Sequence, residues 1–110
     1  MRPIEEVEIQ IEMAKRIQSL RDNCITLMQS KEFKDVIEEG YFKEEAARLV
    51  MAKSSFMDET QKQLIDNMIY GIGAFKNWLE SNMRRGDEMD QALAGHKKTR
   101  EELLKEEVLQ

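Results

Sequence analysis

The chain contains one cysteine, Cys24, and one histidine, His96, among its 110 residues. A thiol and an imidazole within hydrogen-bond reach could act as a nucleophile and its base. That pairing requires a specific geometry, whereas a cysteine within an apolar helical pattern is ordinarily a small core residue. We therefore interpret Cys24 as a core residue and His96 as a partly exposed one. A single cysteine also excludes an intramolecular disulfide.

Metal-binding and acid–base motifs are missing from the sequence. One cysteine and one histidine cannot form a zinc site, and the Glu-x-x-His pairs of di-metal bundles are absent because Leu93 and Thr99 flank His96 at three-residue spacing. Adjacent acidic residues recur, but neighbours on a helix point about 100° apart, so they indicate a solvated surface rather than a catalytic pair. We expect a protein that is not an enzyme and has no cofactor.

A pair of glycines, Gly71 and Gly73, lies within "MIYGIGAFKNWLE". A dinucleotide-binding loop would need a third glycine where Lys76 stands and a strand before the pair. Both are missing. Each glycine inside a helix costs up to about 1 kcal/mol relative to alanine, so the pair suggests a use, such as the close approach of another helix or a kink. The predicted helix-packing or oligomer contact consists of Gly71, Gly73, Ile72, Phe75 and Trp78.

Other side chains are candidates for binding a partner. The aromatic pair Tyr41 and Phe42 could close a helix end and enter the core, or could form an exposed hot spot with Lys43 and Arg48. The first interpretation is favoured. The candidate partner surface also includes Leu103 and Leu104, near the C-terminus. Three weak candidates for phosphate contact lie close to them in the sequence: Lys97, Lys98 and Arg100.

The composition favours an all-α protein. Glu, Lys, Gln, Met, Ala and Leu dominate, all of them helix formers, and there is one proline. The formal net charge of −5 argues against a protein that coats nucleic acid, which needs a basic surface. The sequence has no 18-residue apolar run and no apolar segment of a secretory signal near its first residues, so we expect a protein of the cytoplasm.

Periodicity and capping signals predict five helical segments. A long amphipathic helix is expected over 3–29. A short one runs from Ser30 as N-cap to a stop at Gly40, and a third follows over about 41–54. The D-x-x-Q capping box of Asp58 and Gln61 starts the fourth and most apolar helix, which we expect to end at Gly86. The last segment, 87–110, is a charged helix with a thin apolar stripe that docks only in part.

These lengths predict one domain over 1–110. A helix of 27 residues is about 40 Å long, which would span or overshoot a compact body of this size, roughly 35 Å across. The expected fold is an elongated antiparallel hairpin or bundle of two or three long helices with two short ones. Such a shape buries little surface by itself, so we expect a homo-oligomer.

Three stretches, "VIEEGYFKEEAARLV", "DNMIYGIGAFKNWL" and "HKKTREELLKEE", resemble small helical proteins of tailed bacteriophages. The resemblance covers most of the chain and implies a protein made in a bacterial host's cytoplasm, with or without later incorporation in the virion. The function we expect is non-enzymatic virion structure or assembly through helix-mediated oligomerisation and binding to a phage or host protein. The alternatives are a host-directed inhibitor and, third, a DNA-packaging or nucleic-acid adaptor.

Overall fold

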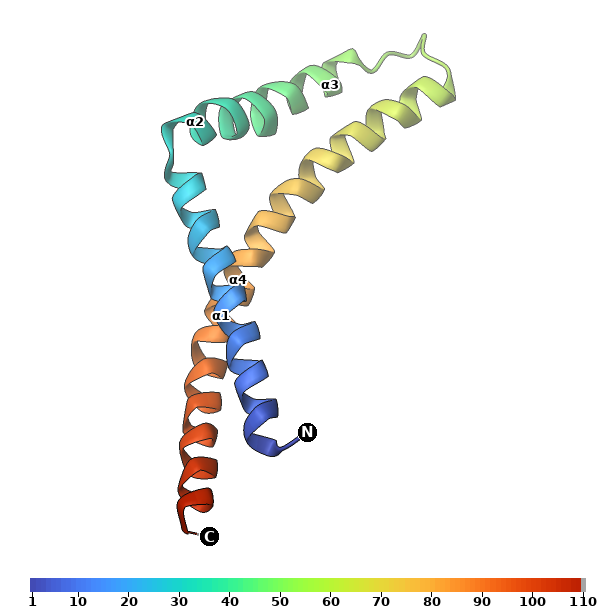
Figure 1. The fold of residues 1–110 in the computed structure, drawn as a ribbon. Coiled ribbons are helices and arrows are strands. Elements are labelled where there is room, and N and C mark those ends of the chain that lie inside the picture. Colours follow the sequence, from blue (N-terminus) through green and yellow to red (C-terminus); the bar gives the residue numbers. More distant parts are fainter. Residues whose placement is uncertain (110) are drawn as a thin grey trace. The chain divides into compact units, whose positions relative to one another are not determined.

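The structure is a computed structural model that describes residues 1–109, and all regular structure in this range is helical. The prediction of an all-α fold is confirmed. Figure 1 shows the elements in chain order. They are α1 (Pro3–Gln29), α2 (Lys31–Phe33), the π-helical segment η1 (Lys34–Glu45), α3 (Ala46–Ala52) and α4 (Glu59–Leu109).

Two predicted helix starts are confirmed by their capping hydrogen bonds. The Oγ of Ser30 accepts a bond from the Phe33 backbone N–H at 3.1 Å. At the start of α4, an Asp58 carboxylate oxygen accepts from the Gln61 N–H at 2.8 Å, and the Gln61 side chain accepts from the Asp58 N–H at 3.2 Å. This reciprocal pair satisfies two amides that have no partner within the helix, so the chain turns into α4 at a fixed residue.

The predicted helix stop at Gly40 is wrong. Gly40 lies inside η1, whose wider turns continue directly into α3. Its φ is negative, so it does not adopt the left-handed conformation of a terminating glycine. The wide turn instead brings the Asp35 carbonyl oxygen within 3.3 Å of the position a Cβ would take at Gly40. π-helical turns are rare and are often found at functional sites.

The predicted break at Gly86 is also wrong. α4 runs from Glu59 to Leu109 without interruption, so no separate helix begins at residue 87. The segment predicted as a C-terminal helix over 87–110 is the second half of α4, and its last residue lies outside the described range. A glycine ends a helix when the chain must reverse there, and tertiary packing of both flanks can override its weak helix propensity.

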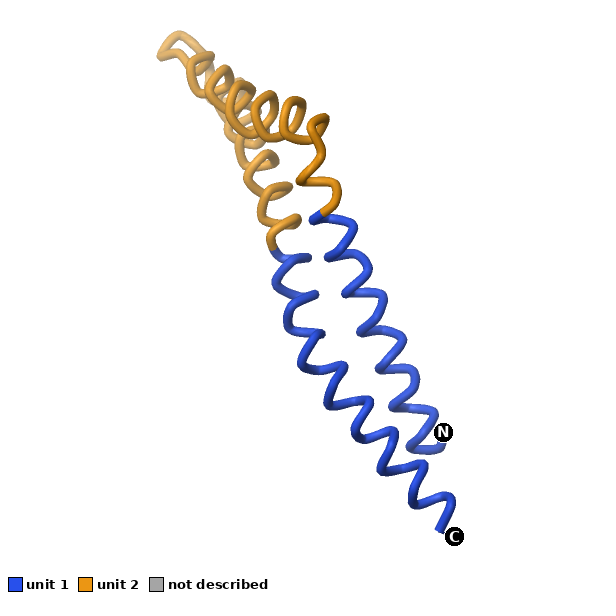
Figure 2. Tube along the Cα trace, turned by 90° about the vertical axis from the view of Figure 1, so that its left-hand side faces the viewer, with its two compact units in different colours: residues 1–25, 81–110 blue, residues 26–80 orange. Residues whose placement is uncertain are grey.

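The chain divides into two compact units (Figure 2). Unit 1 contains residues 1–25 and 81–110, and unit 2 contains residues 26–80. The helices α1 and α4 each contribute to both units. We describe each unit by itself.

Unit 1 is an antiparallel pair of helices, the first part of α1 and the last part of α4, with the start of α1 and the end of α4 at the same end of the pair (Figure 2). Arg2 faces Glu107, Ala14 packs with Leu93, and further contacts join later α1 residues to earlier α4 residues. Buried and half-buried residues recur at alternating steps of three and four on both helices, as in an antiparallel coiled coil. They are Ile4, Val7, Ile11, Ala14, Gln18, Arg21 and Ile25 on α1, and Asn82, Gly86, Met89, Leu93, His96, Arg100 and Leu103 on α4.

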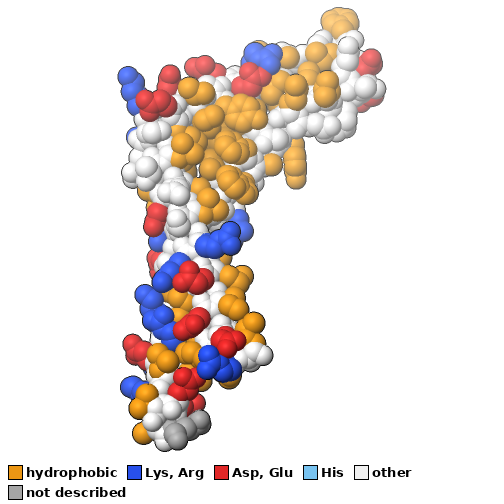
Figure 3. All heavy atoms as spheres, viewed as in Figure 1, with side chains coloured by type: hydrophobic (Ala, Val, Ile, Leu, Met, Phe, Trp, Pro, Cys, Tyr) orange, Lys and Arg blue, Asp and Glu red, His pale blue; other side chains and the backbone are white. Residues whose placement is uncertain are grey.

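Unit 2 packs the segment from α2 to α3 against the first part of α4. Its buried core contains Leu49 from α3 with Ile65 and Ile72 from α4. Partly buried residues surround this core: Phe42, Ala46, Ala52, Met57 and Ile69. Figure 3 shows hydrophobic side chains at the surface between the segment from α2 to α3 and the first part of α4. The apolar stripe of α4 predicted from the sequence therefore has its partner in α3 and η1.

Candidate interaction groove in unit 2

A half-open groove of about 430 Å³ lies in unit 2 between the α2–η1–α3 wall and the α4 wall. Its surface is mostly apolar, since seven of the lining residues carry hydrophobic side chains: Met28, Phe33, Phe42, Ala46, Ile69, Ile72 and Leu79. The volume and lining are those of protein sites that bind apolar groups. We call this feature the unit 2 groove.

Five of the seven aromatic residues of the chain form one cluster at this groove. Phe42 is its centre, with its ring 6.3 Å from Phe33, 6.1 Å from Tyr41 and 5.8 Å from Phe75. Trp78 stacks on Phe75 at 6.3 Å with 16° between the rings. Aromatic pairs of this geometry contribute about 0.5–1.5 kcal/mol each beyond the area they bury. The cluster therefore fixes η1 against α4 and leaves Tyr41 and Trp78 partly exposed beside the groove.

Charged side chains of both signs line the rim on each wall. Glu38 and Lys43 belong to η1, and Lys76 and Glu80 belong to α4. Lys43 donates a hydrogen bond to Glu39 at 2.7 Å, and this bond and the Glu39 charge raise the pKa of Lys43. The groove therefore combines a mostly apolar lining with one acidic and one basic side chain on each wall.

The two glycines singled out from the sequence have different positions. Gly73 lines the unit 2 groove, and Gly71 does not. A Cβ added at either residue would meet no other part of the described chain within 4 Å. The prediction that another helix or side chain of this chain approaches these glycines closely is therefore wrong for residues 1–109. Contact with a second molecule at Gly71 or Gly73 stays a prediction.

The neighbours of these glycines that were predicted to make contacts lie in the same unit. Ile72 is buried in the core of unit 2, and Phe75 is a half-buried member of the aromatic cluster. The indole of Trp78 is about half exposed. Gly73 projects no side chain into the groove, and no other part of the described chain comes within 4 Å of the position its Cβ would take.

The predicted partner surface falls into two parts. Tyr41, Phe42 and Lys43 lie at or beside the groove, and Arg48 pairs with Glu45 on the same segment. This ion pair lowers the pKa of Glu45 and raises the pKa of Arg48. The remaining two residues belong to unit 1, where Leu103 is half-buried against α1 and Leu104 is exposed. The structure thus groups the aromatic residues with Lys43 in unit 2, and the two leucines belong to unit 1.

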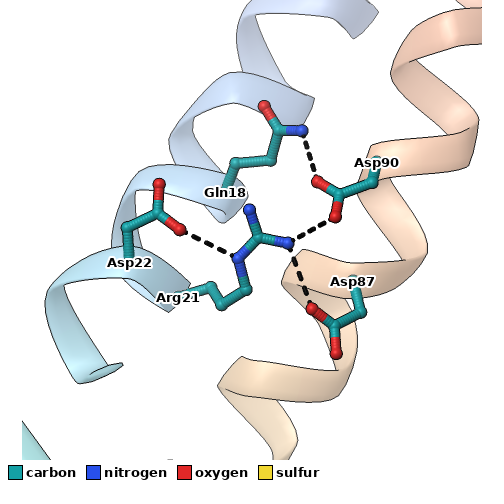
Figure 4. A network of polar contacts seen from close by, with 5 residues as sticks. All are labelled: Gln18, Arg21, Asp22, Asp87 and Asp90. Atoms are coloured by element: carbon teal, nitrogen blue, oxygen red, sulfur yellow. Dashed lines mark hydrogen bonds and ion pairs between the residues drawn. The ribbon is translucent and has the colours of Figure 1, made fainter. Parts of the chain in front are cut away.

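Unit 1 contains a network of polar contacts that joins its two helices (Figure 4). The Arg21 Nη1 donates to Asp90 at 2.7 Å and to Asp87 at 3.1 Å, and its Nε donates to Asp22 at 3.0 Å. Gln18 donates a further bond to Asp90 at 2.8 Å. The hydrogen bond to Asp90, followed by that to Asp22, raises the pKa of Arg21, and the bond from Arg21 lowers the pKa of Asp90. We interpret this network as the determinant of helix register rather than as a reaction centre, because it fixes one pairing of α1 with α4.

Cys24 and His96 are not placed to react together. Cys24 is buried, and its Sγ accepts a long contact of 3.8 Å from the Asn82 side-chain amide. His96 lies farther along α4 by about 21 Å at 1.5 Å per residue, well beyond hydrogen-bond reach. The described residues contain no group of three or more Cys, His, Asp or Glu side chains that could hold a metal ion.

The weak candidates for phosphate contact are only partly grouped. Lys97 and Lys98 are exposed on α4, whereas Arg100 is half-buried along the contact with α1. All three belong to unit 1, whereas the groove residues belong to unit 2.

Comparison with family models, curated proteins and solved structures finds no match to this chain. None of the helices within residues 1–109 has the length and apolar character required to span a membrane.

Sequence reasoning missed several residues of both sites. Phe33, Lys76 and Leu79 line the groove, but nothing in their local spacing distinguishes a groove from a filled core. Arg21 and Gly86 carried a stronger signal. The three-four spacing of α1 continues from Ala14 through Gln18 to Arg21, which places a long side chain in the contact between α1 and α4. A long side chain in such a contact favours a small residue opposite it on the facing helix.

Proposed function

We propose that this chain is a non-enzymatic assembly protein whose unit 2 groove binds an amphipathic helix of another protein. The observation that carries the proposal is the apolar groove of about 430 Å³ with partly exposed aromatic residues beside it. Grooves of this kind receive the apolar face of a helix through side chains spaced three and four residues apart. Partly exposed tyrosine and tryptophan residues are the side chains that most often dominate binding energy.

The charges at the rim favour a helix over a small charged ligand. Each wall presents one acidic and one basic residue, Glu38 with Lys43 and Glu80 with Lys76. A helix with alternating charges along its two flanks complements such walls, as charged flanking residues do in coiled coils. A small ligand with a single charge would meet both signs at the rim and gain little.

The biological setting comes from the sequence. On the resemblance to small proteins of tailed bacteriophages, we propose that the partner is a phage protein and that the complex forms during virion assembly in a bacterial cell. A host protein in the groove would instead make the chain a host-directed inhibitor. Identifying the protein that is crosslinked to the groove, as described next, distinguishes a phage partner from a host partner.

Site-specific photo-crosslinking in the producing cell tests the proposal. A photoreactive amino acid replaces Lys76 at the rim of the groove or, as the control, exposed Gln63 on the same helix outside the groove. We expect one protein to be crosslinked from position 76 and not from position 63, with the modified peptide inside an amphipathic helix. Equal crosslinking from both positions, or none from position 76, would refute a specific groove partner.

A further inference from the structure

The helix α1 carries a second apolar row, in unit 1, that the hairpin leaves uncovered. Ile9, Met13 and Leu20 are 47%, 57% and 44% exposed. At about 100° per residue these three residues fall on the side of α1 opposite Ile4, Val7, Ile11 and Ala14, the residues that pack against α4. We call Ile9, Met13 and Leu20 the outer row. A surface helix of a globular protein normally has one apolar stripe, so a second apolar stripe indicates that another surface buries it.

The charges beside the outer row change sign along the helix. Glu5, Glu8 and Glu12 line the surface around Ile9 and Met13. Arg16 lies between Met13 and Leu20, at the surface that Ile17 also lines. One end of the outer row is therefore acidic, and a cation lies toward its other end.

We propose that a second copy of this chain covers the outer row, with the two α1 helices antiparallel about a two-fold axis. In this arrangement Ile9 lies beside Leu20 of the second copy, and Met13 packs on the aliphatic part of Arg16. The guanidinium of each Arg16 then reaches Glu12 of the other copy. A parallel pairing would bring Glu12 to Glu12 and Arg16 to Arg16, so charge complementarity selects the antiparallel one.

The contact joins two unit 1 hairpins in a row of four helices, with the two α1 helices inside and the two α4 helices outside, because the outer row lies on the side of α1 opposite α4. Two-helix pairs have a narrow core, and the seam of unit 1 includes the polar residues Gln18, Arg21 and Asn82. Pairing two hairpins buries the second apolar face of α1 and adds apolar contact to a hairpin whose own core is narrow. This proposal concerns unit 1 and does not depend on the unit 2 groove.

The first test is sedimentation equilibrium of the purified full chain and of two glutamate variants. Met13→Glu places a charge in the centre of the outer row, and Met51→Glu is the control at an 83% exposed residue of α3 in unit 2. We expect a wild-type dimer that Met13→Glu weakens by about tenfold or more and that Met51→Glu leaves unchanged. A wild-type monomer, or a dimer that tolerates Met13→Glu, would overturn the proposal. Circular dichroism verifies that the variants keep their helix content.

A charge-exchange cycle tests the orientation with exposed residues, whose replacement leaves folding intact. Glu12→Arg and Arg16→Glu should each weaken the dimer by about two- to fivefold, the size expected for exposed ion pairs. The double variant should restore wild-type affinity, because each exchanged pair is again complementary. Glu12 also lies 3.9 Å from Lys15 of its own chain, a contact too exposed to affect the result strongly. Single variants without effect, or a double variant as weak as the singles, would overturn the antiparallel contact.

Discussion

Gly86 of α4 lies directly against the base of the Arg21 side chain of α1. A Cβ built on Gly86 would lie 2.3 Å from the Arg21 Cβ and 2.7 Å from its Cγ. Such distances are far inside van der Waals contact, and the Cβ of Arg21 is fixed to the backbone of α1. The two helices can approach this closely only because residue 86 has no side chain. From this position the Arg21 guanidinium reaches Asp87 and Asp90 on the facing helix.

Replacing Gly86 with alanine should therefore destabilise unit 1, although alanine has the higher helix propensity. Overpacking of this kind costs about 1–3 kcal/mol. The matched control is Gly95→Ala on the same helix, where a Cβ meets nothing within 4 Å of the described chain. That variant should be stabilised by up to about 1 kcal/mol. Urea unfolding followed by circular dichroism measures both, and variants that shift in the same direction would contradict the close packing at Gly86.

Asp90→Asn should lower stability at neutral pH and have a smaller effect in acid. The folded-state pKa of Asp90 lies below its ordinary value near 3.8, because Arg21 and then Gln18 donate hydrogen bonds to the carboxylate. A depressed pKa stabilises the fold above the unfolded-state value, and this stabilisation is lost as the pH falls through the folded-state pKa. The difference between wild type and Asp90→Asn in thermal unfolding should shrink below about pH 4.

The control for this measurement is again Gly95→Ala, which changes no ionisable group. Its offset from wild type should be the same at pH 7 and pH 3, two values chosen on either side of the ordinary carboxylate range, roughly pH 4. An Asp90→Asn offset that is equally large at both pH values would show that the lost interaction does not depend on the carboxylate charge.

The aromatic cluster predicts unequal effects for two phenylalanines of unit 2. Phe42 contacts the rings of Phe33, Tyr41 and Phe75, whereas Phe56 is 98% exposed. Phe42→Ala should cost on the order of 2–3 kcal/mol, less than the loss of a fully buried ring, and Phe56→Ala should cost almost nothing. Near-ultraviolet circular dichroism should also change only for Phe42→Ala. Similar unfolding midpoints for the two variants would count against the cluster.

Local signals predicted much of the helical structure. The range of α1, the caps at Ser30 and Asp58 and the start of α4 follow from apolar periodicity and from side chains that bond to nearby amides. These interactions lie within a few residues of one another, so the sequence contains them directly. The positions of the helix ends at Gly40 and Gly86 were wrong, because the conformation of a glycine depends on what packs around it.

The sites were harder to predict, since they depend on contacts between distant residues. The sequence showed that Gly73 needed an explanation, but the relevant fact is the empty space beside it, which arises from α2, η1 and α4 together. Likewise, the three-four spacing of α1 extends to Arg21, but its close packing becomes evident only when Gly86 of α4 lies opposite it. Tyr41 and Phe42 were recognised as binding candidates because exposed aromatic side chains beside Lys43 and Arg48 can form a hot spot.

The central claim is that the unit 2 groove is the binding surface, and the two glycines of α4 test it most directly. Gly73 lines the groove, Gly71 does not, and a Cβ at either meets no other part of the described chain within 4 Å. The measurement is the affinity of Gly73→Leu and Gly71→Leu for the protein crosslinked from position 76, with melting temperatures of both variants as the folding control. The account predicts that Gly73→Leu fills the groove and binds at least about tenfold more weakly, a difference of about 1.4 kcal/mol, while Gly71→Leu binds as wild type does. Equal affinity of the two folded variants would contradict it.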